Sequence, residues 1–199
     1  MSIKGFIVLE GLDGAGTTTQ LDMLTKAYEE QGKTVKRTFE PTDSEIGKLI
    51  RRIQRGEIRT TSESLALLYA SDRHNHLFGE DGIIENAEKG NIVLSDRYFY
   101  SSYAYQSSFC CPEWVREINN YPPPEILIFV DPPVDECLRR INARNEKKEI
   151  FEKREILTRV RENYLKSFEN LPDDVRFLHI EGILSIEETT KRIRDFLNL

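Results

Sequence analysis

The stretch FIVLEGLDGAGTTTQ, residues 6–20, is the strongest indication of the fold in the sequence, because it has the order of a strand, a glycine-rich turn and the start of a helix. Its glycines, Gly11, Gly14 and Gly16, allow the backbone to come close to a ligand. Backbone N–H groups in such a turn bind phosphate together with the N-terminal end of the next helix, without any side chain. The stretch therefore predicts a phosphate-binding loop, with an ordinary tight turn between strand and helix as the alternative.

The loop departs from the usual phosphate-loop pattern at one position. The pattern G-x-x-x-x-G-K-[ST] requires lysine where Thr17 stands, whereas Thr18 keeps the hydroxyl that usually reaches Mg²⁺. Removing one preorganised donor to developing charge costs about 2.7–4 kcal/mol, on the order of 10²–10³ in rate. If the site is catalytic, another cation of the chain has to compensate for the absent lysine.

Outward from this stretch, short apolar runs alternate with amphipathic segments along the whole chain. The strand candidates are residues 6–10, 34–39, 91–96, 125–131 and 175–180. The helix candidates are residues 18–31, 62–77, 151–169 and about 185–197. The alternation predicts a single α/β domain over residues 1–199, with a five-stranded parallel sheet, helices on both faces, and ligands at the carboxyl ends of the strands.

Three helix candidates carry boundary or packing signals. Gly32 is expected to end the first helix, and a capping box from Thr60 to Glu63 is expected to begin the second. The third helix should bury the residues that recur every four positions, Ile156, Val160, Tyr164 and Phe168.

Composition limits the class of protein. The formal net charge is -6, from 28 Lys+Arg against 34 Asp+Glu, which argues against nucleic acid as the main partner. No apolar run approaches the roughly 18 residues that span a bilayer, and no signal-peptide pattern is present. Three cysteines without C-x-x-C spacing favour a reducing cytoplasm over a disulfide framework. The three histidines, His74, His76 and His179, show no metal-binding spacing.

Four motifs follow one another along the chain: EGLDGAG (10–16), LYASDR (68–73), DRYFYSSYAYQ (96–106) and FVDPP (129–133). Together they make residues 6–196 resemble a thymidylate kinase, a member of the P-loop nucleoside monophosphate kinases. The resemblance implies an enzyme that transfers the γ-phosphoryl group of MgATP to dTMP, giving dTDP and ADP in dTTP synthesis, and it implies a homodimer. It also implies that ATP binds to the loop residues Gly11, Leu12, Asp13, Gly14, Ala15, Gly16, Thr17 and Thr18.

The base of dTMP is expected to lie between the second and third motifs. Tyr69 and Arg73 are four residues apart on one helix, and suit stacking on a pyrimidine and hydrogen bonding to its carbonyl edge. A core tyrosine beside a solvated arginine is the alternative. By resemblance, Tyr105 crowds the 2′ position of the sugar and disfavours ribonucleotides. The residues that offer hydrogen bonds to the base are Ser101, Ser102 and Gln106.

The phosphate end of dTMP is assigned by resemblance alone. Arg97 matches the arginine that grips the acceptor phosphate, and Asp13 matches the carboxylate that contacts the 3′-hydroxyl. Glu40 and Pro41 match the turn on the phosphate side, where the X-Pro bond is a candidate for the cis form.

Two further groups are expected on the ATP side. Thr18 and Asp96, the latter at the end of a central strand, are expected to hold Mg²⁺. Residues 137–155 resemble the mobile lid of the family, in which Arg140 and Arg144 lie four apart on one helical face. A solvated charged helix is the alternative. The catalytic residues in this interpretation are Asp13, Arg97, Arg140 and Arg144, with the lid arginines replacing the lysine.

Thr17 leaves two other functions open. One is a nucleotide-binding protein with lost or weak catalysis, and the other is a kinase for a different deoxynucleoside monophosphate. Retention of the whole acceptor side argues against the first, because a chain freed from catalysis has no evident need for Asp13, Arg73, Asp96 and Arg97 together. Tyr105 and the stacking pair argue more weakly against the second.

Overall fold

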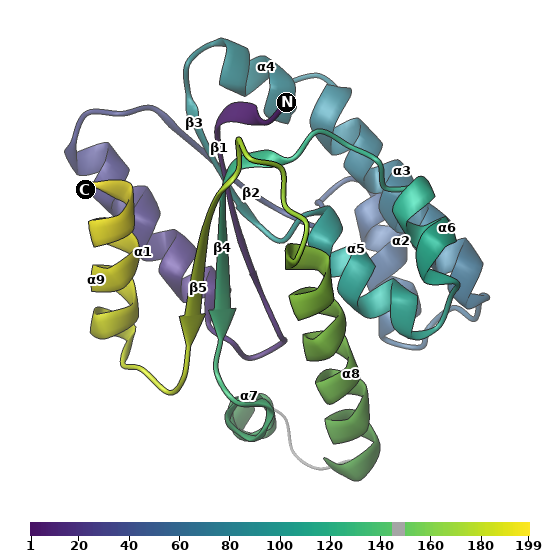
Figure 1. The fold of residues 1–199 in the computed structure, drawn as a ribbon. Coiled ribbons are helices and arrows are strands. Elements are labelled where there is room, and N and C mark those ends of the chain that lie inside the picture. The colour runs from purple at the N-terminus through teal and green to yellow at the C-terminus, as the bar shows by residue number, and fades with distance from the viewer. Residues whose placement is uncertain (145–149) are drawn as a thin grey trace.

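Five parallel strands form one sheet in the computed structural model, which describes residues 1–144 and 150–199, apart from the side chains of residues 144–153. The strands are β1 (Ile3–Gly11), β2 (Val35–Phe39), β3 (Ile92–Asp96), β4 (Pro124–Asp131) and β5 (Arg176–Glu181). Their order across the sheet is β2-β3-β1-β4-β5, so β1 is central and ends in the glycine-rich loop (Figure 1). The predicted five-stranded parallel sheet is confirmed.

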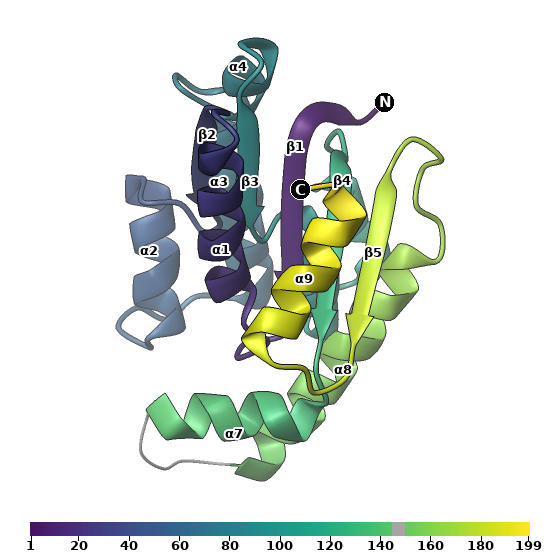
Figure 2. The ribbon, with the colours of Figure 1, turned by 90° about the vertical axis from the view of Figure 1, so that its left-hand side faces the viewer.

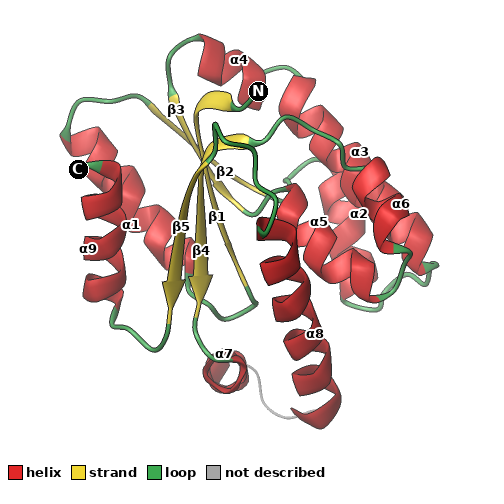
Figure 3. Ribbon diagram, in the orientation of Figure 1, coloured by secondary structure: helices red, strands yellow, loops and turns green. Residues whose placement is uncertain are grey.

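Helices cover both faces of the sheet (Figure 3). The bounds are α1 (Thr17–Glu30), α2 (Glu45–Gln54), α3 (Ser62–Phe78), α4 (Ile83–Glu88), α5 (Phe99–Tyr105), α6 (Pro112–Glu117), α7 (Val134–Arg144), α8 (Ile150–Phe168) and α9 (Ile186–Leu197). A 3₁₀ turn, η1 (Gln106–Ser108), follows α5. Within these described segments, no helix has the length and apolar character needed to cross a membrane.

The central strand is apolar on both faces, because each face packs against helices. Phe6 and Val8 lie in the core cluster shared with α5 and α8, whereas Ile7 and Leu9 lie in the cluster shared with α1 and α9. All four side chains are almost fully buried. The sheet is therefore a rigid support for whatever the loops at its carboxyl edge bind.

The carboxyl edge of the sheet carries the loop after β1 and the crossing helix α7. Figure 2 shows α7 lying below the ends of the strands, roughly across their direction. It follows β4 directly, and α8 then returns along the sheet with one face of its C-terminal half buried. Helix α7 is thus in position to contact the phosphate loop from outside the sheet.

Two expectations about helices need correction. The N-cap of α3 is Thr61, whose hydroxyl accepts from Ser64 N at 3.2 Å, so the capping box from Thr60 to Glu63 is wrong by one residue. In α8, Ile156 is exposed and Leu157 is buried in its place. Four-residue steps advance about 40° each around a helix, so a stripe counted back from Phe168 leaves the buried face by Ile156.

Candidate active site

The backbone of the phosphate loop depends on its glycines. Gly14 and Gly16 have φ angles of +84° and +100°, which side-chain-bearing residues rarely adopt. A Cβ on Gly14 would lie 2.7 Å from the carbonyl oxygen of Cys137, and one on Gly11 would lie 2.8 Å from that of Val130. The packing of the loop against β4 and α7 therefore requires glycine, independently of any ligand.

Thr17 and Thr18 begin α1 and differ in environment. Thr17 is buried, whereas Thr18 is exposed and its hydroxyl donates to Asp96 Oδ2 at 2.5 Å. Asp96 Oδ1 is buried and finds no hydrogen-bond partner among the residues that the structure describes. A hard cation with a preference for oxygen ligands fits this pair, because it would satisfy the buried carboxylate oxygen.

Three cavities adjoin one another along the carboxyl edge of the sheet. The central one, about 360 Å³, lies over the phosphate loop and reaches Asp96. A second, about 230 Å³, shares Asp13 and Arg97 with it. A third, about 300 Å³, shares Gly14 and Gly16 with it and extends between α7 and the start of α9. The loop therefore has one small-molecule space on each side of it.

The 230 Å³ space, called the acceptor cavity below, brings together every residue predicted to bind dTMP. Its walls come from the phosphate loop, the turn after β2, α2, α3 and the segment from Arg97 through α5 to η1, which are far apart in the sequence. The cis form expected for the Glu40–Pro41 bond is confirmed. The lining residues are Asp13, Glu40, Pro41, Gln54, Tyr69, Arg73, Arg97, Ser101, Ser102, Tyr105 and Gln106.

Arg97 stands between the acceptor cavity and the central cavity. Its backbone has φ +75°, an uncommon conformation for a residue with a side chain and one that often occurs at functional sites. Its guanidinium donates to Asp13 Oδ1 at 2.7 Å and lies 5.3 Å from the centre of the Tyr105 ring. Its side chain is about one-fifth exposed, so the arginine presents part of its positive charge where the two cavities meet.

Two tyrosines line the acceptor cavity. The Tyr69 hydroxyl accepts from Gln54 Nε2 at 2.6 Å, and burial raises the pKa of Tyr69 to about 12. The Tyr105 hydroxyl accepts from the backbone N–H of Asp13 at 3.0 Å, which attaches that ring to the phosphate loop. Both phenols are therefore neutral at physiological pH and present ring faces rather than charge.

Two oxygens in the wall of the acceptor cavity are buried without partners among the described residues. They are Ser102 Oγ and Gln106 Oε1. A buried polar atom without a hydrogen bond is costly, so a ligand with matching polar edges would be stabilised by contact with them. A pyrimidine base has such edges.

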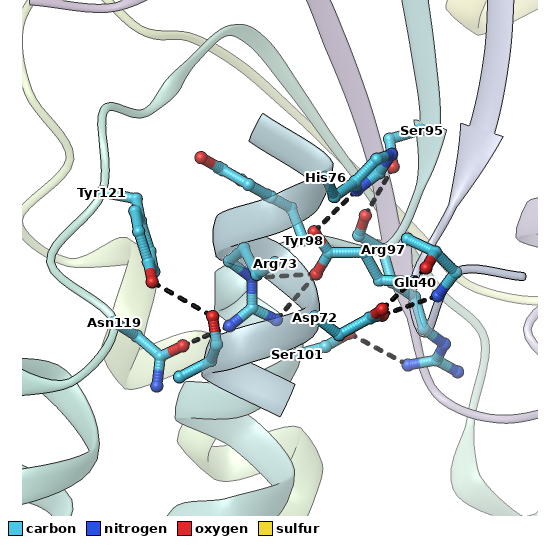
Figure 4. A network of polar contacts seen from close by, with 12 residues as sticks. Glu40, Asp72, Arg73, His76, Ser95, Arg97, Tyr98, Ser101, Asn119 and Tyr121 are labelled. Carbon is cyan, nitrogen blue, oxygen red and sulfur yellow. Dashed lines mark hydrogen bonds and ion pairs between the residues drawn. The ribbon is translucent and has the colours of Figure 1, made fainter. Parts of the chain in front are cut away.

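Arg73 is held in place by a buried network (Figure 4). Its side chain is 1% exposed, and its Nε and Nη2 lie 2.8 and 2.7 Å from Glu40 Oε2. Its Nη1 donates to Asn119 Oδ1, and His76 Nδ1 lies 3.0 Å from the other oxygen of Glu40. The alternative of a solvated arginine is therefore excluded. The same network ties Glu40 to α3 and thereby positions the turn at Pro41.

Helix α7 places one lid arginine on the phosphate loop. Arg140 Nη1 lies 3.1 Å from the carbonyl oxygen of Ala15 and 3.4 Å from that of Gly14, and its Nε donates to Glu136 at 2.7 Å. Arg144 ends α7, but its side chain and residues 145–149 of the expected lid lie outside the described part of the chain. The guanidinium of Arg140 thus reaches the loop that lacks its lysine.

The sequence matches one protein family over most of its length. The family model described as thymidylate kinase matches residues 9–193. The chain belongs to the thymidylate kinase family. The probable thymidylate kinase of Thermococcus gammatolerans is 41% identical over 94% of this chain and 93% of its own length. The probable thymidylate kinase of Pyrococcus horikoshii is 43% identical over 84% of this chain and 84% of its own length. The putative thymidylate kinase of Treponema pallidum is 36% identical over 96% of this chain and 93% of its own length.

Several residues at this thymidylate kinase site were not expected from the sequence. Gln54 comes from α2, for which no signal was recognised, and Asn119 follows a short helix that was also missed. His76, for which the sequence indicates only the lack of metal-binding spacing, hydrogen-bonds Glu40. Glu10 ends a predicted strand and begins the motif EGLDGAG, but no role was expected for it; a charged residue at the end of an apolar run is the signal that could have found it.

Proposed function

We infer that the protein is an ATP-dependent thymidylate kinase, which transfers the γ-phosphoryl group of ATP to dTMP and gives dTDP and ADP for dTTP synthesis. The observation that carries this inference is the junction of the acceptor cavity with the cavity over the phosphate loop at Asp13 and Arg97. Phosphoryl transfer requires the donor and the acceptor to be aligned and their charge to be compensated, and it requires little covalent chemistry from the protein.

Each wall of the acceptor cavity has a proposed role in binding dTMP. Tyr69 stacks on the base, and Arg73 donates to a base carbonyl from its fixed position. The unpartnered oxygens of Ser102 and Gln106 accept from the base or its solvent shell. Tyr105, attached to the loop through Asp13, limits the space beside the sugar, which favours a deoxyribose.

The phosphate ends of the two nucleotides meet at charged groups. Arg97 binds the acceptor phosphate, and Asp13 both orients this arginine and contacts the 3′-hydroxyl. The loop from Gly11 to Thr18 holds the phosphates of ATP through its backbone N–H groups. Thr18 and Asp96 hold Mg²⁺, a metal that usually takes only one or two protein ligands. When bound, the metal neutralises charge on the transferring phosphoryl group.

Arg140 is proposed to supply the cation that Thr17 cannot. A guanidinium in contact with the carbonyls of Gly14 and Ala15 lies on the donor side of the loop, and an arginine supplied by the same chain is an established way to stabilise a transferring phosphoryl group. Arg144, four residues further on α7, is proposed to act with it. If Arg140 has this role, the absence of lysine at Thr17 no longer argues for a nucleotide-binding protein without turnover.

An ADP-release assay with the purified protein tests the function. We expect turnover that requires both MgATP and dTMP, and we expect dTMP to be preferred over the corresponding ribonucleotide and over dGMP. Calorimetric binding of ATP and dTMP without ADP formation above the buffer rate would instead favour the protein that has lost catalysis. Equal rates with other deoxynucleoside monophosphates would favour the broader kinase.

A homodimer in the cytoplasm is also proposed. Leu67 and Phe78 are about half exposed and lie eleven residues apart on α3, which places them on one face of this helix. His74 lies on the same face and packs its ring 4.9 Å from that of Phe78. Such an apolar face fits a second copy of the chain. Light scattering should give twice the mass of the chain, and Phe78→Glu should reduce it to the mass of one chain.

A further inference from the structure

The carboxylate of Glu10, at the end of β1, lies fully buried beneath the phosphate loop. It accepts from the backbone N–H groups of Tyr98 and Ser101 at 2.8 and 3.3 Å. It also accepts from two hydroxyls, that of Ser101 at 2.6 Å and that of Tyr164 at 2.9 Å. Among the described residues no lysine or arginine pairs with it directly, so hydroxyl and N–H donors satisfy this carboxylate.

Tyr164 brings α8 into this network. Its side chain is fully buried, with its ring 5.1 Å from that of Phe129 and edge-on to that of Tyr105 at 6.2 Å. Its hydroxyl lies 2.8 Å from the Ser101 hydroxyl, and Arg97 Nη1 donates to both oxygens at 3.3 and 3.1 Å. Two hydrogen-bonded routes therefore lead from the Arg97 guanidinium to Glu10, one through each hydroxyl.

We propose that Tyr164 is a positioning residue for phosphoryl transfer: its hydroxyl, together with that of Ser101, couples the Glu10 carboxylate to the Arg97 guanidinium and holds the arginine where the acceptor phosphate binds. The inference deepens the proposed function and rests on it. Tyr164 itself contacts no substrate, because its hydroxyl is enclosed by Glu10, Ser101, Arg97 and the carbonyl of Gly11.

The physical reason for such a support is the geometry of Arg97. One end of its guanidinium is held by Asp13 at the surface, and this contact alone leaves the guanidinium plane free to rotate about the Nη2 contact. Donation from Nη1 to the two hydroxyls fixes the plane, because each hydroxyl is itself held by Glu10. Because the guanidinium of Arg97 is fixed on both sides, its remaining N–H groups point to the phosphate-binding position before the acceptor binds.

The contact also links two parts of the enzyme. Tyr164 lies on α8, the helix that follows the α7 segment carrying Arg140. Arg97 lies at the opposite side of the phosphate loop, between the acceptor and central cavities. The hydroxyl of Tyr164 is thus the point at which α8 contacts the arginine that faces the acceptor.

Tyr164→Phe tests the proposal, with Tyr100→Phe as the matched control. Both variants remove one hydroxyl from a buried tyrosine and keep the ring, but the Tyr100 hydroxyl makes no hydrogen bond to Glu10, Ser101, Arg97 or Tyr164. We expect Tyr164→Phe to lower kcat/KM for dTMP about ten- to a hundredfold, as for loss of a hydrogen bond to a charged group, and to leave the KM for ATP within about twofold. In Tyr100→Phe, kcat/KM for dTMP and the KM for ATP should both stay within about twofold of the wild-type values.

An Arg97→Ala background separates positioning from general support of the fold. If Tyr164 acts through the arginine, Tyr164→Phe should change dTMP affinity, measured by calorimetry, by no more than about twofold once the arginine is absent. An equal loss in both backgrounds, or a parallel rise in the KM for ATP, would mean that the hydroxyl only stabilises α8 and would overturn the proposal.

The Nε–Hε resonance of Arg97 in the ligand-free protein gives a readout that does not depend on the substrate. It should shift and broaden in Tyr164→Phe and remain unchanged in Tyr100→Phe, and an unchanged resonance in Tyr164→Phe contradicts the proposal. Absence of dTMP binding in the wild type, in contrast, contradicts the proposed function alone. Normal wild-type turnover with an unaffected Tyr164→Phe variant contradicts the positioning role alone.

Discussion

At the scale of single residues, the acceptor cavity shows that the type of a side chain does not determine its role, because that role depends on the contacts the side chain makes in the fold. Tyr69 has a ring that suits stacking, but its hydroxyl is used by Gln54, a residue from a different helix. Arg73 looks like a surface cation in the sequence, and in the fold it is almost completely buried by Glu40 and Asn119. In both residues the partner, rather than the residue itself, determines which atoms are presented to a ligand.

Substitutions of Tyr69 separate its ring from its hydroxyl. Tyr69→Ala should weaken dTMP binding by roughly 1–3 kcal/mol, the usual value of one base–aromatic stack. Tyr69→Phe keeps the ring and loses only the contact with Gln54, so we expect a loss of about 1 kcal/mol or less. Calorimetry with dTMP measures both. Unchanged affinity in Tyr69→Ala would show that the ring only fills the wall of the cavity.

At the scale of elements, the strands were predictable and the connections were not. The inner strands β1, β3 and β4 are largely apolar runs, because parallel strands inside a sheet are covered on both faces, whereas the edge strands β2 and β5 also contain charged residues. The short helices α4, α5 and α6 have six or seven residues, too few for a periodic pattern to be recognised. The stripe of α8 correctly predicted burial of Tyr164, but a hydrophobic period cannot indicate what its hydroxyl contacts.

The candidate site was predictable for a different reason. Residues of the acceptor cavity were assigned from motifs that resemble a family, and no spacing argument would have joined Glu40 with Tyr69 and Ser102. The glycines of the phosphate loop, in contrast, follow from physical chemistry alone, since Gly14 and Gly16 adopt positive φ angles. Gln54 and Asn119 were missed because they belong to neither a quoted motif nor a recognised helix.

Helix α7 leads to a prediction about the missing lysine. Arg140→Ala should lower kcat on the order of 10²–10³, the usual effect of losing one donor to developing charge, while dTMP affinity changes little. Arg139→Ala is the control, because both hydrogen bonds of the Arg139 side chain go to Glu136 and none to the phosphate loop. The decrease in kcat of Arg139→Ala should be far smaller than that of Arg140→Ala. Steady-state kinetics and calorimetry measure the two effects.

Thr17→Lys then tests whether the loop still accepts an ammonium group. Thr17 is buried in a loop that retains its glycines and Thr18, so we expect the lysine to restore part of the rate of Arg140→Ala. Thr17→Lys should increase kcat more in the Arg140→Ala background than in the wild type. The effects of the two substitutions are not additive, because both side chains stabilise the same transferring phosphoryl group. If Arg140→Ala leaves kcat unchanged and Thr17→Lys has no effect in either background, backbone amides and Mg²⁺ carry the charge without α7.

At the scale of the whole molecule, a carboxylate in the core connects stability with activity. Burial raises the pKa of Glu10 to about 7 from about 4.5, against the opposing effects of the Ser101 hydroxyl, the Arg97 charge, the Tyr164 hydroxyl and the Tyr98 N–H group. The groups that face it are Arg97 and Tyr98 before α5, Ser101 and Tyr100 on α5, and Tyr164 on α8. Near neutral pH the protein therefore contains both protonation states of this residue.

The two consequences of this titration have opposite signs. A carboxyl whose folded-state pKa is raised contributes stability that is complete below pH 4.5 and is lost as pH rises through about 7. A shift of this size corresponds to roughly 3 kcal/mol. The ionised form, in turn, accepts from both hydroxyls that hold Arg97. Rising pH should thus reduce the free energy of unfolding while it favours the acceptor site.

Urea unfolding of the wild type and Glu10→Gln at pH 5, 6, 7 and 8 isolates this group. Glutamine is neutral at every pH and adds only a constant offset, because its amide meets the same donors throughout. The wild type should therefore lose roughly 2.5 kcal/mol relative to the variant across this range, most of it below pH 7. Over the same range kcat/KM for dTMP should rise in the wild type and remain flat in Glu10→Gln. Parallel stability curves would mean that Glu10 keeps one charge state from pH 5 to 8, and the increase in activity with pH should then be absent as well.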